Sequence, residues 1–255
     1  MTAGLAFTWW GHASATVELA GVRVALDPLL SDRLFHLRRY AAPPDGTATD
    51  VDVVLVSHLH HDHLHLRSLG RFARELPIVV PRGGERLLRD LGLDRVVPAA
   101  PGETLELAGA RITVLPATHD GSRGPGSSAT GPALGYRVDA ADRSLWFPGD
   151  TEVREDMADV GHVDLALVPV GGWGPTLEDG HMSPVDGARA VGLVGATTAV
   201  PVHWGTFWPI GLRHARRANH HRLFTTPGER FVAALADTGQ AAVSLIARQG
   251  ERVTL

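Results

Sequence analysis

The residues best suited to chemistry stand in the segment Ser57-His58-Leu59-His60-His61-Asp62-His63-Leu64. The apolar, β-branched run before this segment predicts a buried strand, so His58 and His60 leave its end two residues apart and project to the same side. Imidazole and carboxylate groups in such a cluster are typical ligands of zinc-like metals. We expect His58 and His60 to share one ion. Asp62 and His63 follow where the chain is expected to enter a helix, and they suit a second ion close by.

Three later apolar runs also end in a residue of a metal-binding type. These are His119 after Ile112–Leu115, Asp150 after Ser144–Phe147, and His203 after Thr198–Val202. Taken singly, each is more often a hydrogen-bonded structural residue or a turn than a ligand. Taken together, four strand ends could meet at one edge of a sheet and supply seven ligand groups, which is enough for two ions.

The segment His58–His63 has the form His-x-His-x-Asp-His and so resembles the signature of the metallo-β-lactamase superfamily. The three later candidates follow in the order expected of that superfamily. The resemblance implies an α/β protein with a four-layer αββα sandwich, in which helices lie outside two sheets. It also implies two ligand sets joined by a bridging residue: His58, His60 and His119 for the first ion, Asp62, His63 and His203 for the second, and Asp150 between them.

Four further segments resemble the branch that contains ascorbate-6-phosphate lactonase and N-acylphosphatidylethanolamine phospholipase D. They are Trp10-Gly11-His12-Ala13-Ser14, Asp27-Pro28, His181-Met182-Ser183-Pro184 and His203-Trp204-Gly205-Thr206-Phe207. We expect His12 and Asp27 to lie behind the ligands, where outer carboxylates commonly orient a ligand histidine. A hydrogen-bonded buried imidazole for His12 and a turn cap for Asp27 are equal alternatives.

Two residues outside the metal set are candidates for contact with the substrate. His181 precedes a helix whose cap is expected at Ser183; it could polarise a substrate oxygen or protonate the leaving group, or be a loop histidine without a role. Arg123 lies in a Gly/Ser stretch behind His119 and could clamp an anion through its planar fork, with a solvated arginine as the alternative. Both assignments concern substrate binding.

The segment Leu29–Pro44 resembles a lid beside the metal site. Its leucines stand at near-helical spacing, with Arg33, Arg38 and Arg39 among and after them. Packing of the leucines against the neighbouring sheet explains the same pattern.

Two adjacent cations would act on a bridging water, which loses a proton near neutral pH and becomes a hydroxide aimed at phosphorus or a carbonyl carbon. Asp62 would orient this hydroxide, and His181 would serve the leaving group. We therefore expect a dinuclear metallohydrolase, with a phosphodiester or another phosphorylated small molecule ahead of a lactone or ester as its substrate. A non-catalytic metal-binding protein on the same fold is an alternative from another class, and a di-iron redox protein is a third, disfavoured interpretation.

Composition sets the remaining limits. The 255 residues are 44% hydrophobic and no linker divides them, so one domain over residues 1–255 is expected. The net charge of −4 gives no basic field for nucleic acid. Without Cys the ligands are N and O donors, which suit zinc, with manganese and iron as alternatives. With neither a leader-like N-terminus nor an integral membrane segment in the sequence, we expect a cytoplasmic protein acting on a small molecule; homo-oligomerisation stays open.

Apolar periodicity predicts alternating strands and helices. The expected strands are Ala6–Trp10, Ser14–Leu19, Val22–Leu26, Val51–Val56, Ile78–Val80, Ile112–Leu115, Leu134–Val138, Ser144–Phe147, Leu165–Val168, Thr198–Val202 and Ala241–Ile246. The expected helices are Leu64–Glu75, Gly84–Leu91, Pro184–Leu193 and Pro227–Thr238.

Overall fold

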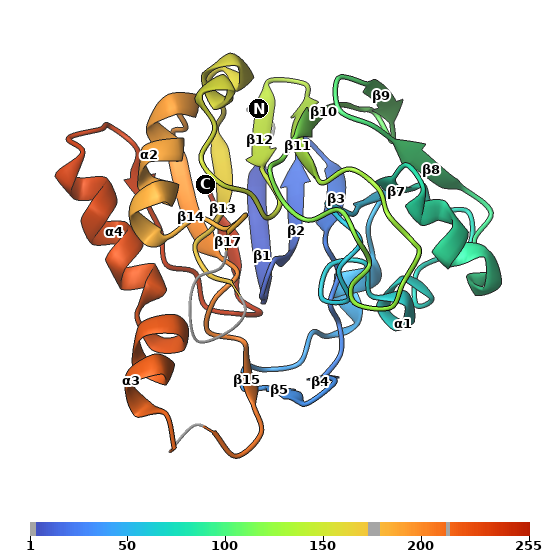
Figure 1. Cartoon of the computed structure of the whole chain (residues 1–255). Helices are drawn as coiled ribbons and strands as arrows, with labels where there is room; N and C mark the ends of the chain where they lie inside the picture. Colours follow the sequence, from blue (N-terminus) through green and yellow to red (C-terminus); the bar gives the residue numbers. More distant parts are fainter. Residues whose placement is uncertain (1–3, 173–178, 213–214) are drawn as a thin grey trace.

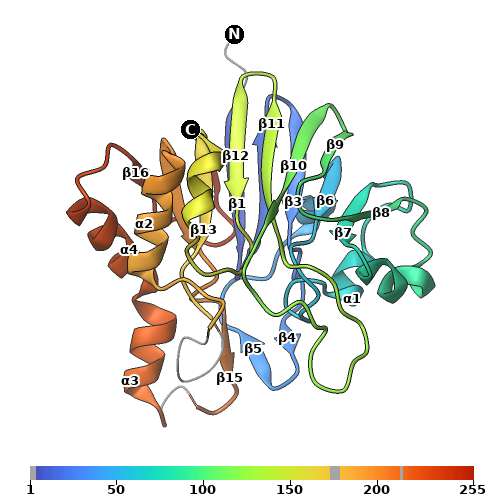
Figure 2. The same ribbon diagram turned by 45° about the horizontal axis from the view of Figure 1, so that its top comes forward.

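Two mixed sheets packed face to face form the centre of the protein (Figures 1 and 2). The computed structural model describes residues 4–172, 179–212 and 215–255; the other residues of the expected domain, 1–3, 173–178 and 213–214, lie outside the described part. No helix in the described part is long and apolar enough to cross a membrane.

The first sheet has seven strands. In spatial order they are β17 (Arg252–Thr254), β1 (Leu5–Gly11), β2 (Ser14–Leu19), β3 (Val22–Leu26), β6 (Val53–Leu55), β7 (Ile78–Pro81) and β8 (Val96–Ala99). The strands from β17 to β3 pair antiparallel, and those from β3 to β8 pair parallel. Because β3 and β6 run in the same direction, the residues that follow them emerge at the same edge of the sheet.

The second sheet also has seven strands. In spatial order they are β16 (Val243–Ser244), β14 (Thr198–Val202), β13 (Leu165–Pro169), β12 (Arg143–Phe147), β11 (Leu134–Ala140), β10 (Ala110–Pro116) and β9 (Thr104–Leu107). The strands from β9 to β12 pair antiparallel, and those from β12 to β16 pair parallel. As a result β10, β12 and β14 all run in one direction and end at one edge.

A small third sheet lies beyond the lower ends of the two large sheets in Figures 1 and 2. It consists of β15 (Phe207–Pro209), β5 (Leu37–Arg39) and β4 (Arg33–Leu34), all antiparallel. It joins the segment Leu29–Pro44 to residues far along the chain, and it stands where the lid was expected.

Helices cover the outer faces of both large sheets. They are α1 (Leu66–Leu69), α2 (Pro184–Val194), α3 (Arg217–His220) and α4 (Pro227–Asp237), with the 3-10 and π-helical segments η1 (Gly46–Thr49), η2 (Gly84–Leu91), η3 (Glu155–Val160) and η4 (His221–Thr225). Residues of α2 and α4 pack on the second sheet, and residues of α1 and η2 pack on the first. The predicted αββα arrangement is confirmed.

The α2 helix has the start that its sequence predicts. The Ser183 hydroxyl accepts from the Asp186 backbone N–H, the Asp186 carboxylate accepts from the Ser183 backbone N–H, and Pro184 occupies the first turn. Gly195 ends the helix in the left-handed conformation (φ 74°), which glycine adopts without strain. This cap fixes the chain directly after His181.

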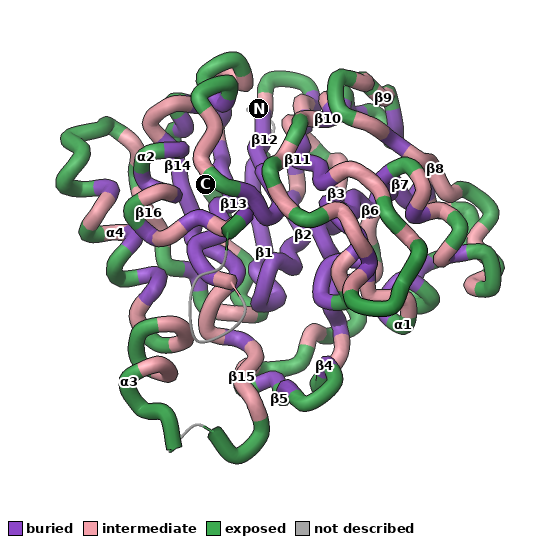
Figure 3. The backbone as a smooth tube through the Cα atoms, viewed as in Figure 1, coloured by how far each residue is buried: buried purple, intermediate pink, exposed green. Residues whose placement is uncertain are grey.

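The largest core lies between the two sheets. It contains aromatic residues of both, among them Phe7 and Trp9 from β1, Tyr136 from β11 and Phe147 from β12, all at most 1% exposed. The Tyr136 hydroxyl donates to the Val56 carbonyl at 2.7 Å and so links the second sheet to the strand end that precedes the histidine segment. Figure 3 shows the buried backbone concentrated in these central strands.

One predicted helix is wrong in form, and the segment with near-helical leucine spacing forms strands. The helix expected over Leu64–Glu75 is helical only in α1 (Leu66–Leu69), because His65 caps its start and turns follow; Leu64, Leu69 and Phe72 are still buried against the first sheet. In the segment Leu29–Pro44, Leu34 and Leu37 belong to the β4–β5 hairpin, which pairs with β15, whereas Leu29 and Leu30 precede the hairpin. In both segments the apolar residues are buried as expected, but long-range packing selects the backbone.

Candidate metal centre

The predicted ligands meet where the strands of the two sheets end. Asp27 follows β3 and His58 follows β6 in the first sheet, while His119, Asp150 and His203 follow β10, β12 and β14 in the second. The strands bearing these residues run in a common direction within each sheet, so their ends converge. His/Asp groups whose ligand atoms lie within 4.8 Å of one another are found at this convergence.

The first cluster consists of His58, His60 and His119. The distance from His58 Nε2 to His60 Nδ1 is 3.0 Å, and that from His119 Nε2 to His60 Nδ1 is 3.1 Å. Ligands held about 2.0–2.1 Å from a tetrahedral zinc ion lie ~3.3 Å apart. The three ring nitrogens are therefore spaced as the ligands of one ion.

The second cluster centres on His63, His203 and Asp150. The Nε2 atoms of His63 and His203 lie 3.2 Å apart, and each lies 3.2 Å from Asp150 Oδ2. Asp62 Oδ2 lies 3.7 Å from His63 Nε2 and completes the set. Asp150 also groups with His58, so it stands between the two clusters.

Two buried atoms of the second cluster have no hydrogen-bond partner within the described part of the chain. They are Asp150 Oδ1 and His203 Nδ1. An unpartnered buried carboxylate oxygen costs free energy unless a cation or a donor satisfies it. A donor set of imidazole nitrogens and carboxylate oxygens suits zinc, manganese or iron. The residues present therefore fit divalent metal ions.

Asp27 and Ser57 hold two of the histidines from behind. The distance from His63 Nδ1 to Asp27 Oδ2 is 2.7 Å, and Ser57 donates to Asp27 through its backbone N–H (2.7 Å) and its hydroxyl (2.5 Å). Ser57 Oγ also lies 3.0 Å from His58 Nδ1. With the Nδ1 atoms engaged in this way, the Nε2 atoms face the centre. Asp27 thus has the contact expected of an orienting carboxylate.

His119 and His12 have comparable contacts behind the centre. The distance from His119 Nδ1 to the Gly180 carbonyl is 2.9 Å. His12 Nε2 lies 2.8 Å from Asp62 Oδ2, and the His12 backbone N–H donates to Thr206 Oγ1 at 2.6 Å. His12 therefore holds the same oxygen of Asp62 that faces His63, and its nitrogen is also close enough to group with the second cluster.

The backbone at the centre adopts conformations that non-glycine residues rarely take. His12, Asp27 and His203 have positive φ angles of 53°, 38° and 67°. Such strain persists where surrounding contacts over-determine it, and it is common at functional sites. Gly149 also has positive φ (64°), and a Cβ there would lie 2.6 Å from the Leu134 carbonyl oxygen. Only glycine fits directly before Asp150.

Both carboxylates of the centre are held ionised. Burial opposes ionisation of Asp150, but its attraction to His203 and His63 holds its pKa well below the usual value. Burial likewise opposes ionisation of Asp62, and its contacts with His63 and His12 hold its pKa well below the usual range. Anionic ligands are therefore ready to bind cations at neutral pH.

The histidines differ in protonation. Burial, with His63 next in effect, lowers the pKa of His58 well below its ordinary value, and burial lowers the pKa of His119 to about 4. Burial also acts on His63, but the attraction of Asp150, Asp62 and Asp27 raises the pKa of His63 well above its usual value. Metal binding to His63 therefore has to displace a proton from its ring.

His181 lies beside the first and second clusters. Its Nε2 atom is 3.5 Å from Asp150 Oδ2, its ring centre is 4.7 Å from that of His119, and its side chain is 8% exposed. The same atoms form a group with His119 and Asp150. His181 is thus close enough to reach a substrate at the centre, and also close enough to be weighed as a ligand.

Arg123 has surroundings that differ from those expected. It is 6% exposed, so the solvated-loop interpretation is wrong. Its Nη1 donates to the Leu59 and Leu64 carbonyls, both at 2.6 Å. Arg39, expected near the site as a cation, is also buried and donates to the Trp10 and Leu29 carbonyls. These arginines hold backbone around the centre, and we interpret Arg123 as a residue that positions the histidine loop.

Some residues of the site carry no signal in the sequence. Nothing in the sequence distinguishes Ser57 from other serines, but the fold places it in contact with Asp27 and two histidines. A glycine is required at position 180, because a Cβ there would lie 2.6 Å from His119 Nδ1. The other two histidines of the histidine segment lie at its periphery: His61 is exposed against Phe35, and His65 caps α1.

Two mixed sheets that meet at a buried edge of histidine and aspartate residues are the architecture of a metal-binding protein. Residues 22–204 match the family model described as a beta-lactamase superfamily domain, and the chain belongs to the metallo-β-lactamase superfamily. Within it, the chain falls in the branch of metal-dependent hydrolases shared by its curated relatives.

Two of these relatives illustrate the branch. A UPF0173 metal-dependent hydrolase of Methanopyrus kandleri is 34% identical over 214 residues, covering 80% of this chain and 85% of its own. The N-acyl-phosphatidylethanolamine-hydrolyzing phospholipase D 1 of Caenorhabditis elegans is 32% identical over 234 residues, covering 82% of this chain. This chain spans 65% of that relative's length.

A solved structure shows the same fold. A metallo hydrolase of Ignicoccus hospitalis, Igni18, aligns over 99% of this chain and 98% of its own with a TM-score of 0.72 and 20% identity. At that identity the likeness concerns the fold alone.

Proposed function

We propose that the chain is a single hydrolase domain, residues 1–255, that uses two divalent metal ions, zinc first among the candidates. Its substrate in this proposal is a phosphodiester or another phosphorylated small molecule. The first ion would be held by His58, His60 and His119, and the second by Asp62, His63 and His203, with Asp150 between them.

The position of Asp150 carries the proposal. Its carboxylate lies within ligand distance of both clusters, and one of its buried oxygens has no partner in the described chain. A carboxylate held ionised between two histidine groups suits two cations better than one. A merely structural cluster would leave this oxygen unsatisfied.

Divalent ions bound here would supply Lewis acidity and lower the pKa of water toward neutrality. Asp62, fixed by His12 at 2.8 Å, would orient the attacking water through its ionised carboxylate. Hydrolysis forms a bond from the water oxygen to phosphorus, breaks the bond to the leaving oxygen, and delivers a proton to that oxygen. His181 would give this proton, a contribution typically worth about 10²–10⁴-fold.

The phosphoester assignment rests on the branch. A relative 32% identical to this chain is named for hydrolysis of N-acyl-phosphatidylethanolamine, which is a phospholipid. A lactone presents a carbonyl carbon to the same centre and is the second candidate, because the same metal-site chemistry serves acyl and phosphoryl substrates.

Turnover of matched substrates tests the proposal. Zinc- or manganese-loaded protein would be assayed with bis(p-nitrophenyl) phosphate, p-nitrophenyl acetate and γ-butyrolactone, with metal-depleted protein as the control. We expect metal-dependent cleavage of the phosphodiester to exceed that of the lactone. Efficient lactone cleavage without phosphodiesterase activity would reverse the substrate order. No turnover of any of them, with metal bound, would favour the non-catalytic alternative.

A further inference from the structure

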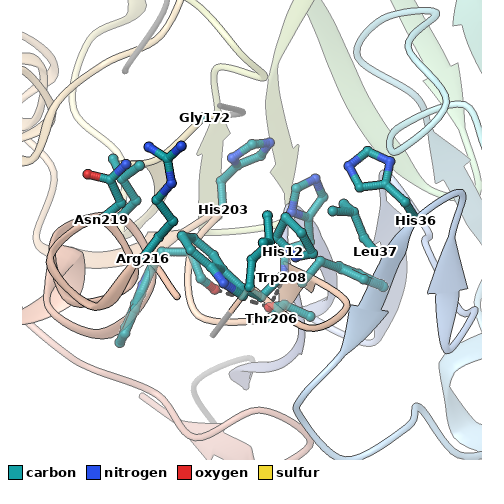
Figure 4. Close-up of a pocket in the computed structure, with 14 residues that line it drawn as sticks. His12, His36, Leu37, Gly172, His203, Thr206, Trp208, Arg216 and Asn219 are labelled. Carbon is teal, nitrogen blue, oxygen red and sulfur yellow. Dashed lines mark hydrogen bonds between the residues drawn. The ribbon is translucent and has the colours of Figure 1, made fainter. Parts of the chain in front are cut away.

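A cavity of about 370 Å³ opens beside the metal centre (Figure 4). His12 and His203 form its inner side, so it begins at the second metal cluster. Its other walls come from the β4–β5 hairpin, from β15 and from the segment around α3 and η4. The volume lies within the range of about 300–1,000 Å³ found for small-molecule sites.

We propose that this cavity selects substrates carrying an apolar group, and that Arg216 at its edge pairs with a negatively charged oxygen of the substrate. The ligand class is an anionic phosphoester with an alkyl or aryl substituent. The inference rests on the proposed phosphoesterase function and specifies the chemical nature of the substrate group that does not react.

The walls away from the metals are mainly apolar. They include Leu37, Phe207, Trp208, Pro209 and Leu223. Apolar linings with a few placed polar groups are typical of sites that bind organic ligands. Burial of one methylene group in such a lining tightens binding about two- to fourfold.

The apolar surface continues from the cavity to the outside. Leu212 lines the cavity and is 44% exposed, and Phe35 and Ile210 beside its lining residues are 71% and 51% exposed. The Ile210 backbone N–H donates to the His36 carbonyl at 3.1 Å, which ties the two loops together. Large exposed apolar side chains gathered at a cavity indicate a binding surface.

Polar groups lie along one side of the cavity. Figure 4 shows the side chains of Asn219, Arg216, His203 and His36 extending along the upper side, with Thr206 below. In the described part of the chain no carboxylate pairs with Arg216, so its planar fork is available to an anion. Trp208 adds a buried indole N–H that finds no acceptor among the described residues.

Most of the outer wall lies outside the part of the chain that matches the family model. That match ends at residue 204, whereas the wall has lining residues between Thr206 and Leu212 and between Arg216 and Leu223; only the β4–β5 hairpin of the wall lies within the matched range. The metal ligands all lie within the matched range. The wall is therefore the part of the site that can specify a substrate without altering the metal chemistry.

A chain-length series tests the inference. Metal-loaded protein would be assayed with methyl and octyl p-nitrophenyl phosphate below their aggregation concentrations, and binding of octyl phosphate would be measured separately by calorimetry. We expect kcat/KM for the octyl ester to exceed that for the methyl ester by about 10²-fold or more. Leu223→Trp, which narrows the cavity, should abolish most of this preference.

The arginine has a matched control in the next residue of the chain. Arg216→Ala should weaken binding of octyl phosphate by roughly tenfold, whereas Arg217→Ala, an exposed neighbour that does not line the cavity, should leave it unchanged. Equal effects of the two variants would overturn the role of Arg216. Binding of the protein to vesicles of phosphatidylcholine with phosphatidylglycerol would be compared with its binding of octyl phosphate. This comparison would distinguish a lipid headgroup from a free phosphoester as the source of the anion.

Failure of this inference and failure of the proposed function give different results. If the methyl and octyl esters are cleaved equally well, the cavity does not select an apolar group, although the phosphoesterase proposal holds. If no phosphodiester is cleaved but octyl phosphate binds more tightly than methyl phosphate, the cavity inference holds and the proposed reaction is wrong. Equal binding of the two phosphates overturns the cavity inference in either case.

Discussion

The metal centre and the outer wall of the cavity are built in opposite ways. The centre is buried, its residues follow the ends of long-range sheet strands, and most of its polar atoms have partners. The wall belongs to a three-stranded sheet and short helical turns, is half exposed, and includes an arginine without an ion partner in the described chain. The contrast indicates that the kind of reaction and the choice of substrate reside in separate parts of the molecule. Substitutions in the centre should lower every activity, whereas substitutions in the wall should change the ranking of substrates.

The largest effect is expected for Asp62. Asp62→Asn removes the charge that contacts His63 and His12 while keeping the shape, and turnover of every substrate should fall by roughly 10³-fold or more because a metal ligand and the orienting group are lost together. Steady-state kinetics with a phosphodiester and a lactone would measure it. Asp142→Asn, on an exposed turn, is the control. A loss confined to one substrate would contradict the separation of reaction from substrate choice.

His181 should have the next largest effect. His181→Ala should lower kcat by about 10²-fold or more because the leaving group loses its proton donor, and the metal content should be unchanged. His61→Ala removes an exposed histidine near the centre and serves as the control. Unchanged kinetics would show that His181 has no catalytic role, and loss of metal would show that it is a ligand.

Replacement of Asp27 should act through His63. In Asp27→Asn the carboxylate that holds His63 Nδ1 becomes an amide, and metal affinity or activity should fall about 10–100-fold, as for other outer carboxylates. Metal titration with a competing chelator would measure the affinity. An affinity equal to that of the wild type would show that Ser57 and the backbone suffice to orient the ring.

Arg123 should have the smallest effect on catalysis and a measurable effect on folding. Arg123→Ala removes the donor of the Leu59 and Leu64 carbonyls and should lower the free energy of unfolding by roughly 1–3 kcal/mol. Because its charge faces backbone, phosphodiester and lactone turnover should change by similar factors. Arg252→Ala, which breaks an exposed pair with Glu18, should cost at most about 1 kcal/mol. A selective loss of phosphodiester turnover in Arg123→Ala would instead support the interpretation that Arg123 binds the anionic group of the substrate.

The edge that carries the candidate ligands could be predicted from the sequence because the ligand residues follow four apolar strands. His58, His119, Asp150 and His203 are signalled locally, and the strand ends needed only to converge. The strands Ser14–Leu19, Val22–Leu26 and Thr198–Val202 have the predicted bounds for the same reason. Sheet strands with continuous apolar runs carry their own periodicity.

The outer wall could not be predicted in this way. β5 and β15 have three residues each, which is too short for a periodic pattern, and they find each other across about two thirds of the chain. Arg123 stands among glycines and serines, which suggested solvent, but its partners are carbonyls 59 to 64 residues away. Contacts of this kind depend on the finished fold and leave no local trace in sequence.

The number of metal ions per chain tests the central claim most directly. Protein reconstituted with excess zinc, freed of unbound metal and analysed for its elements should contain about two ions per chain, from the two-cluster arrangement around Asp150. Asp150→Ala should reduce this number while the fold persists. A content of one ion or fewer in the wild type, with all seven ligand residues intact, would contradict the dinuclear account.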